Sequence, residues 1–255
     1  MGQHIDSELD GGVLEIRIDR VDKKNALTAD MYTDLCDLLE RAADNTEVRA
    51  VLLTGHGDAF TSGNDLADFL DTPPTGPESP VIRFLGVIST TPLPLVAAVN
   101  GLAVGIGTTM LLHCDLVYAG RDATFQLPFV NLGLVPEAGV SLLLPRVAGH
   151  ARAAALLMLG EPFGAGEADR LGLLTACVEP AELMATARAA ARKLAAKPRG
   201  ALRATKALMR RDEEPLADRM RAEIEEFAAR LHSPAAREAF GAFLEKRRPD
   251  FSNCD

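Results

Sequence analysis

The chain has 255 residues, with 27 lysines and arginines against 36 aspartates and glutamates, and its formal net charge at pH 7 is −9. This charge argues against a nucleic-acid-binding protein, because such proteins need a basic surface. With 47% hydrophobic and 25% charged residues, the composition is typical of a globular protein and excludes disordered, collagen-like and coiled-coil chains. The length fits one or two domains.

Cysteine usage and hydropathy bear on the cell compartment. The four cysteines are widely spaced and include no C-x-x-C pair, so we expect reduced thiols in a cytoplasmic protein. The first twelve residues lack the basic flank and the unbroken apolar run of a secretory signal. The most apolar stretch, residues 96–112, is interrupted by Asn100 and three glycines. We therefore expect no targeting segment and no membrane partner.

The first part of the chain alternates strand and helix patterns. Apolar and charged side chains alternate in residues 13–18, which predicts a strand with one buried face. Residues 28–43 have apolar side chains at helical spacing, with Thr28 or Asn25 as the cap. Residues 49–55 are almost continuously apolar, as in a strand that is covered on both faces.

The middle of the chain continues this alternation. The proline-rich segment 68–79 is expected to be a loop that borders a binding site. Strands are expected in residues 93–101 and 114–120, with a glycine-spaced helix over 103–113 between them. A short strand is expected at 123–128.

The last hundred residues are alanine-rich and helical, with one interruption at 171–180. We therefore divide the chain near residues 195–205 into an α/β body, residues 1–200, and a helical region, residues 201–255. The helical region cannot bury much apolar area alone, so we expect it to pack on the body or on a neighbouring subunit. The strand, turn and helix rhythm fits a spiral of ββα turns as well as a flat doubly wound sheet.

Three segments could carry chemistry: 59–66, 99–115 and 127–145. In the first two, glycines and small residues stand where a strand passes into a helix. Unpaired backbone N–H groups at helix starts can point at one negative oxygen, which is the geometry of an oxyanion hole. The alternative is that these glycines only permit tight turns and close helix packing.

Other site types fit less well. The glycines around Ile106 do not form a dinucleotide fingerprint, because Met110 stands where the third small residue is needed. No G-x-S-x-G elbow is present and no histidine has a triad context. His113, Cys114 and Asp115 are adjacent, so they do not suit a tetrahedral metal site, and core packing at a helix end is the better interpretation.

The three segments, together with DKKNALT at 22–28 and SPAAREAFGAFLEKRRPDF at 233–251, resemble the crotonase family, the enoyl-CoA hydratase/isomerase superfamily. The resemblance covers nearly the whole chain. It implies a crotonase-like α/β spiral of ββα turns, a C-terminal helical trimerisation region and a homotrimer or hexamer. It also implies an acyl-CoA thioester as substrate, with no separate cofactor because coenzyme A is part of that substrate.

The resemblance also assigns roles to individual residues. The thioester oxygen would accept hydrogen bonds from the backbone N–H groups of Asn64 and Ile106. The family's hydratases use two glutamates, and Thr109 and Phe129 fill those positions here. Neither residue can act as a carboxylate base, which argues against ordinary hydration.

Glu137 stands where isomerases of the peroxisomal type have a single catalytic glutamate, so we expect it to be catalytic. The alternative is a solvated loop glutamate without a role. Four neighbours would provide an apolar setting that raises its pKa: Leu132, Leu134, Val135 and Val140. Asp65 is expected to hold the turn or to cap the helix rather than to transfer protons.

Substrate contacts follow by resemblance. Lys23 would lie near the nucleotide phosphates, with Ala26 and Leu27 near the adenine and pantetheine. Phe243 and Lys246 would reach the site from the tail. The remaining predicted substrate-binding residues are Ser62, Leu66, Gly105, Thr109 and Phe129. The alternative is that these basic residues are solvated surface cations, and we prefer it for Lys24, Arg247 and Arg248. Lys246, Arg247 and Arg248 are expected to lie in the last helix.

The leading hypothesis is an isomerase that converts 3-enoyl-CoA to trans-2-enoyl-CoA. The closest alternative is an enoyl-CoA hydratase with replaced acid and base residues. A non-catalytic relative that binds acyl-CoA or RNA is a third, and the net charge of −9 argues against RNA. A dehalogenase is a weak fit, because the chain has no tryptophan and no matched aspartate or histidine.

Overall fold

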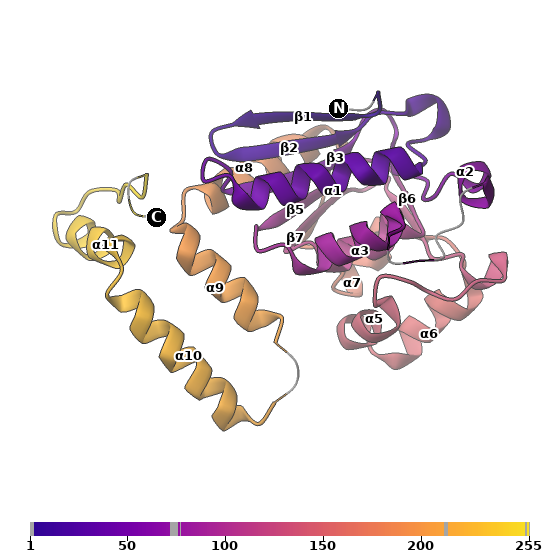
Figure 1. Cartoon of the computed structure of the whole chain (residues 1–255). Coiled ribbons are helices and arrows are strands. Elements are labelled where there is room, and N and C mark those ends of the chain that lie inside the picture. Colours follow the sequence, from indigo (N-terminus) through magenta and orange to yellow (C-terminus); the bar gives the residue numbers. More distant parts are fainter. Residues whose placement is uncertain (1–2, 72–75, 77, 212–213, 253, 255) are drawn as a thin grey trace.

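The computed structural model describes residues 3–71, 76, 78–211, 214–252 and 254, and it contains two β-sheets flanked by helices (Figure 1). The six-stranded sheet has the order β1 (Ile5–Asp10), β2 (Val13–Ile18), β3 (Ala50–Gly55), β5 (Leu95–Val99), β7 (Leu116–Gly120) and β10 (Ala176–Val178). The four-stranded sheet has the order β4 (Ala59–Thr61), β6 (Leu102–Val104), β8 (Thr124–Gln126) and β9 (Phe163–Gly164). The pairs β1–β2 and β8–β9 are antiparallel, and all other neighbours are parallel.

Successive turns of the chain contribute one strand to each sheet. The pairs β3–β4, β5–β6 and β7–β8 are each joined by only two or three residues, and the chain then returns through helices. Gly101 forms one of these corners with a φ of +123°, and a Cβ atom there would lie 2.2 Å from the Asp58 carbonyl oxygen. This repeated pattern is the spiral of ββα turns, which a flat doubly wound sheet does not contain.

Helices cover the six-stranded sheet on both faces. Val51 and Leu53 of β3 join the main core with α1 (Ala29–Asp44), whereas Leu52 joins a second cluster with Leu183 and Ala187 of α8 (Leu183–Ala195). The other helices of the body are α2 (Leu66–Asp71), α3 (Pro80–Thr90), α4 (Ile106–Thr109), α5 (Val140–Ala148), α6 (His150–Leu159) and α7 (Ala165–Arg170). The 3-10 helices are η1 (Val21–Lys23), η2 (Met110–His113), η3 (Val130–Leu132) and η4 (Pro180–Glu182). The double cover explains why β3 is apolar throughout.

The chain ends in α9 (Arg199–Met209), α10 (Leu216–Leu231) and α11 (Pro234–Leu244). The buried ammonium of Lys206 in α9 donates to the Leu93 carbonyl at 2.5 Å and to Asp115 at 2.7 Å, which joins α9 to the body. Figure 1 shows α10 and α11 projecting from the body, on the side away from α2. The predicted trimer or hexamer stays a prediction.

Several predicted elements are confirmed. The strand at 13–18 is β2 and the strand at 49–55 is β3. The helix predicted after Thr28 is α1, and the Thr28 hydroxyl accepts a hydrogen bond from the Met31 amide at 3.4 Å. Asn25, the other proposed cap, is instead fully buried and donates to the Ala59 carbonyl at 2.7 Å.

Other predictions need correction. The first strand, β1, was not predicted, because its six residues include only two apolar side chains. The helix expected from residue 103 begins at Ile106, because the preceding residues pair with β8. The loop expected at 68–79 begins inside α2, and residues 72–75 and 77 lie outside the described residues.

Lys246, Arg247 and Arg248 follow α11 rather than forming part of it. None of the helices in the described ranges is long and apolar enough to cross a membrane.

Candidate active site

A cavity of about 560 Å³ lies between the segment after β4, the junction of β6 with α4, and residues 128–134. Eight predicted site residues line it: Lys23, Ala26, Ser62, Asn64, Leu66, Gly105, Ile106 and Phe129. The structure thus brings the first two glycine-containing segments and the start of the third to one concave site, as expected for a ligand pocket.

Two backbone amides on the cavity wall have no acceptor within the described part of the chain. The Leu27 amide donates to the Gly63 carbonyl and the Asp65 amide donates to the Leu27 carbonyl, both at 2.8 Å. This pairing leaves the Asn64 amide on the opposite side of the extended segment. Ile106 is the first residue of α4, so its amide has no intrahelical acceptor. Two N–H groups therefore remain available to a ligand oxygen.

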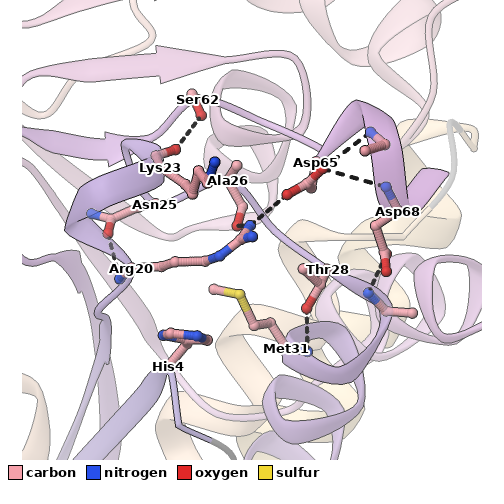
Figure 2. Close-up of polar contacts among 12 residues, drawn as sticks. His4, Arg20, Lys23, Asn25, Ala26, Thr28, Met31, Ser62, Asp65 and Asp68 are labelled. Atoms are coloured by element: carbon pink, nitrogen blue, oxygen red, sulfur yellow. Dashed lines mark hydrogen bonds and ion pairs between the residues drawn. The ribbon is translucent and has the colours of Figure 1, made fainter. Parts of the chain in front are cut away.

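The segment that carries Asn64 is held in place by side chains of the preceding turn (Figure 2). Arg20 donates to Asp65 at 2.7 Å and to the Ala26 carbonyl at 3.0 Å. The other oxygen of Asp65 accepts from the backbone amides of residues 67 and 68 at 3.1 and 3.3 Å. These contacts, above all the bond from Arg20, lower the pKa of Asp65. The prediction that Asp65 holds the turn is confirmed.

Glu137 is held by the short helix that begins at the second amide. Its Oε1 accepts a hydrogen bond of 2.6 Å from the hydroxyl of Thr109, which is one helical turn beyond Ile106. Neither Glu137 nor Thr109 is among the residues that line the cavity, although Ile106, in the same helix as Thr109, does line it. Burial raises the pKa of Glu137, and the bond from Thr109 opposes this in part.

The raised pKa of Glu137 was predicted, and its largest cause is burial, as expected. Leu132, Leu134 and Val135 are exposed, and only Val140 among the four expected neighbours is buried. Thr109, which donates the hydrogen bond to Glu137, is fully buried. Periodicity could not show this, because the contact joins residues 28 positions apart.

Tyr32 is a site residue that the sequence analysis missed. It lies in α1, is 1% exposed, and donates its hydroxyl hydrogen to Oδ1 of Asn64. Its pKa is raised well above the ordinary value by burial and by the negative charge of Glu137. Tyr32 therefore lies close to both the first amide donor and the carboxylate. The sequence did contain a signal for this residue, a tyrosine on the apolar face of a predicted helix. A buried tyrosine hydroxyl needs a hydrogen-bond partner, so its position indicates a polar contact in the core.

The remaining predicted residues lie elsewhere. Leu27 is buried and contributes backbone pairing to the donor segment. Phe243 is 82% exposed in α11, Lys246 follows that helix, and neither lines the cavity. The position of α11 in Figure 1, far from α2, agrees with this. Within the described residues, no group of three or more His, Cys, Asp or Glu side chains could hold a metal ion.

Comparisons with known proteins agree with this geometry. The sequence model of the enoyl-CoA hydratase/isomerase family matches residues 8–254. The 1,2-epoxyphenylacetyl-CoA isomerase of Escherichia coli K12 is 35% identical over 265 residues, covering 99% of each chain. Human enoyl-CoA delta isomerase 2 is 37% identical over 209 residues, covering 79% of this chain and 53% of the human protein.

Solved structures extend the agreement to the whole fold. A Magnetospirillum magneticum AMB-1 protein, provisionally named an enoyl-CoA hydratase/carnithine racemase, superposes with a TM-score of 0.96 at 47% identity, over 99% of this chain and 100% of that one. The structure of Pseudomonas aeruginosa OdaA has a TM-score of 0.80 at 49% identity, over 95% and 99% of the two chains. The chain therefore belongs to the enoyl-CoA hydratase/isomerase family, the crotonase superfamily of enzymes that act on acyl-CoA thioesters.

Proposed function

We propose that this enzyme isomerises 3-enoyl-CoA esters to trans-2-enoyl-CoA, with Glu137 as a single proton shuttle. The observation that carries this proposal is one carboxylate of raised pKa, held by Thr109 in the same short helix whose first amide is the Ile106 donor. The nearest other carboxylate of the donor segment, Asp65, is already paired with Arg20 and with two backbone amides.

The first step of the proposed mechanism is polarisation of the thioester. The amides of Asn64 and Ile106 donate to the thioester oxygen and make the protons on C2 more acidic. As negative charge develops on that oxygen, the two hydrogen bonds strengthen. In other enzymes, one such donor contributes about 3 to 4 kcal/mol to lowering the barrier.

The proton transfers then need only one base. Glu137 removes a proton from C2, and the resulting dienolate carries its negative charge on the thioester oxygen. The protonated Glu137 returns the proton to C4, and the double bond comes to lie between C2 and C3. Atoms and charge balance without a redox or metal cofactor. A raised pKa suits this role, because the group must both accept and donate the proton near neutral pH.

The other predicted residues bind and orient the substrate in this proposal. Lys23 holds a phosphate of the coenzyme, and Ala26 and Ser62 border the pantetheine. Leu66 and Phe129 contact the acyl part, and Gly105 allows close approach at the second donor. Thr109 orients Glu137. Leu27 acts through its backbone, whereas Phe243 and Lys246 would come from a neighbouring subunit of a trimer.

Hydration is the competing reaction, because one relative, of Rhodobacter capsulatus, is named a probable enoyl-CoA hydratase at 37% identity. Hydration must activate a water molecule and also protonate C2, which normally requires a second acid or base. Phe129 cannot transfer a proton, and the Thr109 hydroxyl is already donated to Glu137. These facts favour isomerisation over hydration.

The experiment is product analysis with a 3-enoyl-CoA and a 2-enoyl-CoA supplied separately. We expect trans-2-enoyl-CoA from the first and no 3-hydroxyacyl-CoA from the second. A 3-enoyl-CoA labelled with deuterium at C2 should give product that retains part of the label at C4, because one carboxylate carries it. Rapid formation of 3-hydroxyacyl-CoA would instead identify a hydratase, and complete loss of label to solvent would argue against a single shuttle.

A further inference from the structure

The helical segment formed by α4 and η2 holds two consecutive residues of the carboxylate loop. Thr109 donates its hydroxyl to the side chain of Glu137 at 2.6 Å. Four residues further on, Nε2 of His113 lies 2.8 Å from the carbonyl oxygen of Ala138. One contact therefore fixes the carboxylate and the other fixes the main chain beside it.

The direction of the second hydrogen bond follows from chemistry. A carbonyl oxygen can only accept, so Nε2 of His113 must carry the hydrogen. Burial lowers the pKa of His113, and the positive charges of Arg210 and Lys206 lower it further, against the opposing effect of the Ala138 carbonyl. The ring is thus a neutral donor at neutral pH.

The loop at this point needs external support. Ala138 has a φ of +55° and the following Gly139 has a φ of +67°. The left-handed region is disfavoured for alanine because its Cβ approaches the backbone. Such a conformation persists only where surrounding contacts impose it. The bond from His113 is such a contact, and it acts on the peptide between Ala138 and Gly139, one residue beyond Glu137.

His113 is itself fixed by the first helix of the C-terminal region. Arg210, which follows α9, donates to the His113 carbonyl at 2.7 Å and to the Ser89 carbonyl at 2.8 Å. Lys206 pairs with Asp115 at 2.7 Å, two residues beyond His113. The main chain that carries the imidazole is therefore tied to the C-terminal helical region.

We propose that His113 is a positioning residue, which holds the 138–139 peptide, one residue beyond Glu137, through its Nε2–H and so keeps the Glu137 carboxylate aimed at the substrate. This inference rests on the proposed role of Glu137 as the proton shuttle. An apolar side chain of similar size would fill the same space without making this bond, so packing alone does not account for a histidine here.

The test is a matched pair of variants, His113→Gln and His113→Met, assayed for isomerisation of a 3-enoyl-CoA. The amide nitrogen of glutamine can replace Nε2 as donor, whereas methionine has nearly the same volume and no donor. We expect His113→Met to lower kcat roughly tenfold to a hundredfold with KM nearly unchanged, as for a misplaced catalytic group. His113→Gln should recover most of this loss.

A pH profile separates positioning from general destabilisation. If the carboxylate of His113→Met moves toward solvent, its pKa falls, and the acid limb of kcat should shift to lower pH. Leu112→Ala, a change at a partly buried neighbour that packs on the main core, should lower Tm without moving kcat or the limb. If His113→Met does not fold, His113→Asn replaces it, because its shorter amide cannot reach the carbonyl.

The outcomes distinguish this inference from the proposed function. Three outcomes would overturn the positioning role alone, provided that Glu137→Gln is inactive. They are a wild-type kcat in His113→Met, equal losses of kcat in both histidine variants, and the same changes of kcat and pH profile in Leu112→Ala. Full activity in Glu137→Gln would instead overturn the proposed function and this inference together.

Discussion

The two halves of the candidate site are fixed in different ways. The amides of Asn64 and Ile106 are backbone groups, held by strand pairing and by the start of a helix. The two segments that carry these amides can pack closely because residue 107 is a glycine. A Cβ atom on Gly107 would lie 2.7 Å from the Thr61 side chain. The Glu137 carboxylate is a side chain on a loop with left-handed residues, and side-chain hydrogen bonds support it.

This difference separates what the fold provides from what one residue provides. The oxyanion donors survive most substitutions, because every residue except proline has an N–H group. The carboxylate disappears with a single substitution, and so does its placement when a supporting side chain changes. In the proposed mechanism, the fold therefore supplies the donors that stabilise the enolate, while the acid at position 137 selects the reaction.

The largest expected effect concerns the carboxylate half. Glu137→Gln should lower isomerase turnover by roughly a hundredfold to ten-thousandfold, the usual contribution of a general base, with KM nearly unchanged because the binding contacts remain. Steady-state kinetics with a 3-enoyl-CoA measure both constants. A variant that keeps more than about a tenth of the activity would exclude Glu137 as the base.

The amide half should respond to proline and not to alanine. Ile106→Pro removes the N–H and should cost about a hundredfold to a thousandfold in turnover, as for loss of one oxyanion donor. The fold should survive, because this amide has no acceptor among the residues that the structure describes and proline is tolerated at the first position of a helix. Ile106→Ala keeps the donor and should be mild. Circular dichroism and Tm show whether both variants fold, and turnover shows whether the donor is lost. A folded proline variant of normal activity would exclude Ile106 as a donor.

The halves also differ in how far sequence could predict them. The donor segments are local features, in which glycines and small residues mark a passage from strand to helix, so the segments 59–66 and 99–115 could be recognised, and the resemblance then named Asn64 and Ile106, which line one cavity. The strand and helix pattern predicted most elements for the same reason. It missed β1, whose alternation is weak, and it could not choose the spiral, because the assignment of β3 and β4 to different sheets is a long-range property.

The carboxylate half is built from contacts between distant residues. The bonds of Thr109 with Glu137 and of Tyr32 with Asn64 join residues 28 and 32 positions apart. No local pattern encodes these pairs. Glu137 was identified by resemblance, whereas its true surroundings and the role of Tyr32 required the folded chain.

A smaller effect is expected where the halves meet, at Tyr32. Tyr32→Phe removes the hydrogen bond to the Asn64 side chain but keeps the ring that packs on Phe84 at 5.3 Å. A net hydrogen bond is worth about 0.5 to 1.5 kcal/mol, so kcat/KM should fall a few-fold to about tenfold. The double variant with Asn64→Ala should lose no more than the larger single loss, since both changes break one contact. Strictly additive losses would show that the two side chains act separately.

The stability of the folded protein should decrease as pH rises because of the Glu137 carboxylate. Burial raises the pKa of Glu137 above its unfolded value. Its favourable contribution is therefore fully present below the unfolded pKa and is lost as pH rises through the folded pKa. Glu137→Gln does not titrate, so its Tm relative to wild type should be higher at about pH 8 than at about pH 5. A Tm difference that stays constant or changes in the opposite direction would show that the carboxylate is not desolvated.

The smallest effect is expected at the rim of the amide half, where two adjacent lysines form a matched pair. Lys23 lines the cavity, whereas the side chain of Lys24 is 56% exposed and pairs with Asp58 at 2.6 Å. An exposed charge contact contributes about 0.2 to 1 kcal/mol, so Lys23→Gln should raise KM for the acyl-CoA by at most about fivefold. Lys24→Gln should leave KM unchanged. Because salt screens exposed charges, the difference between the two variants should shrink as ionic strength increases, and equal KM values at low salt would place the coenzyme phosphates away from Lys23.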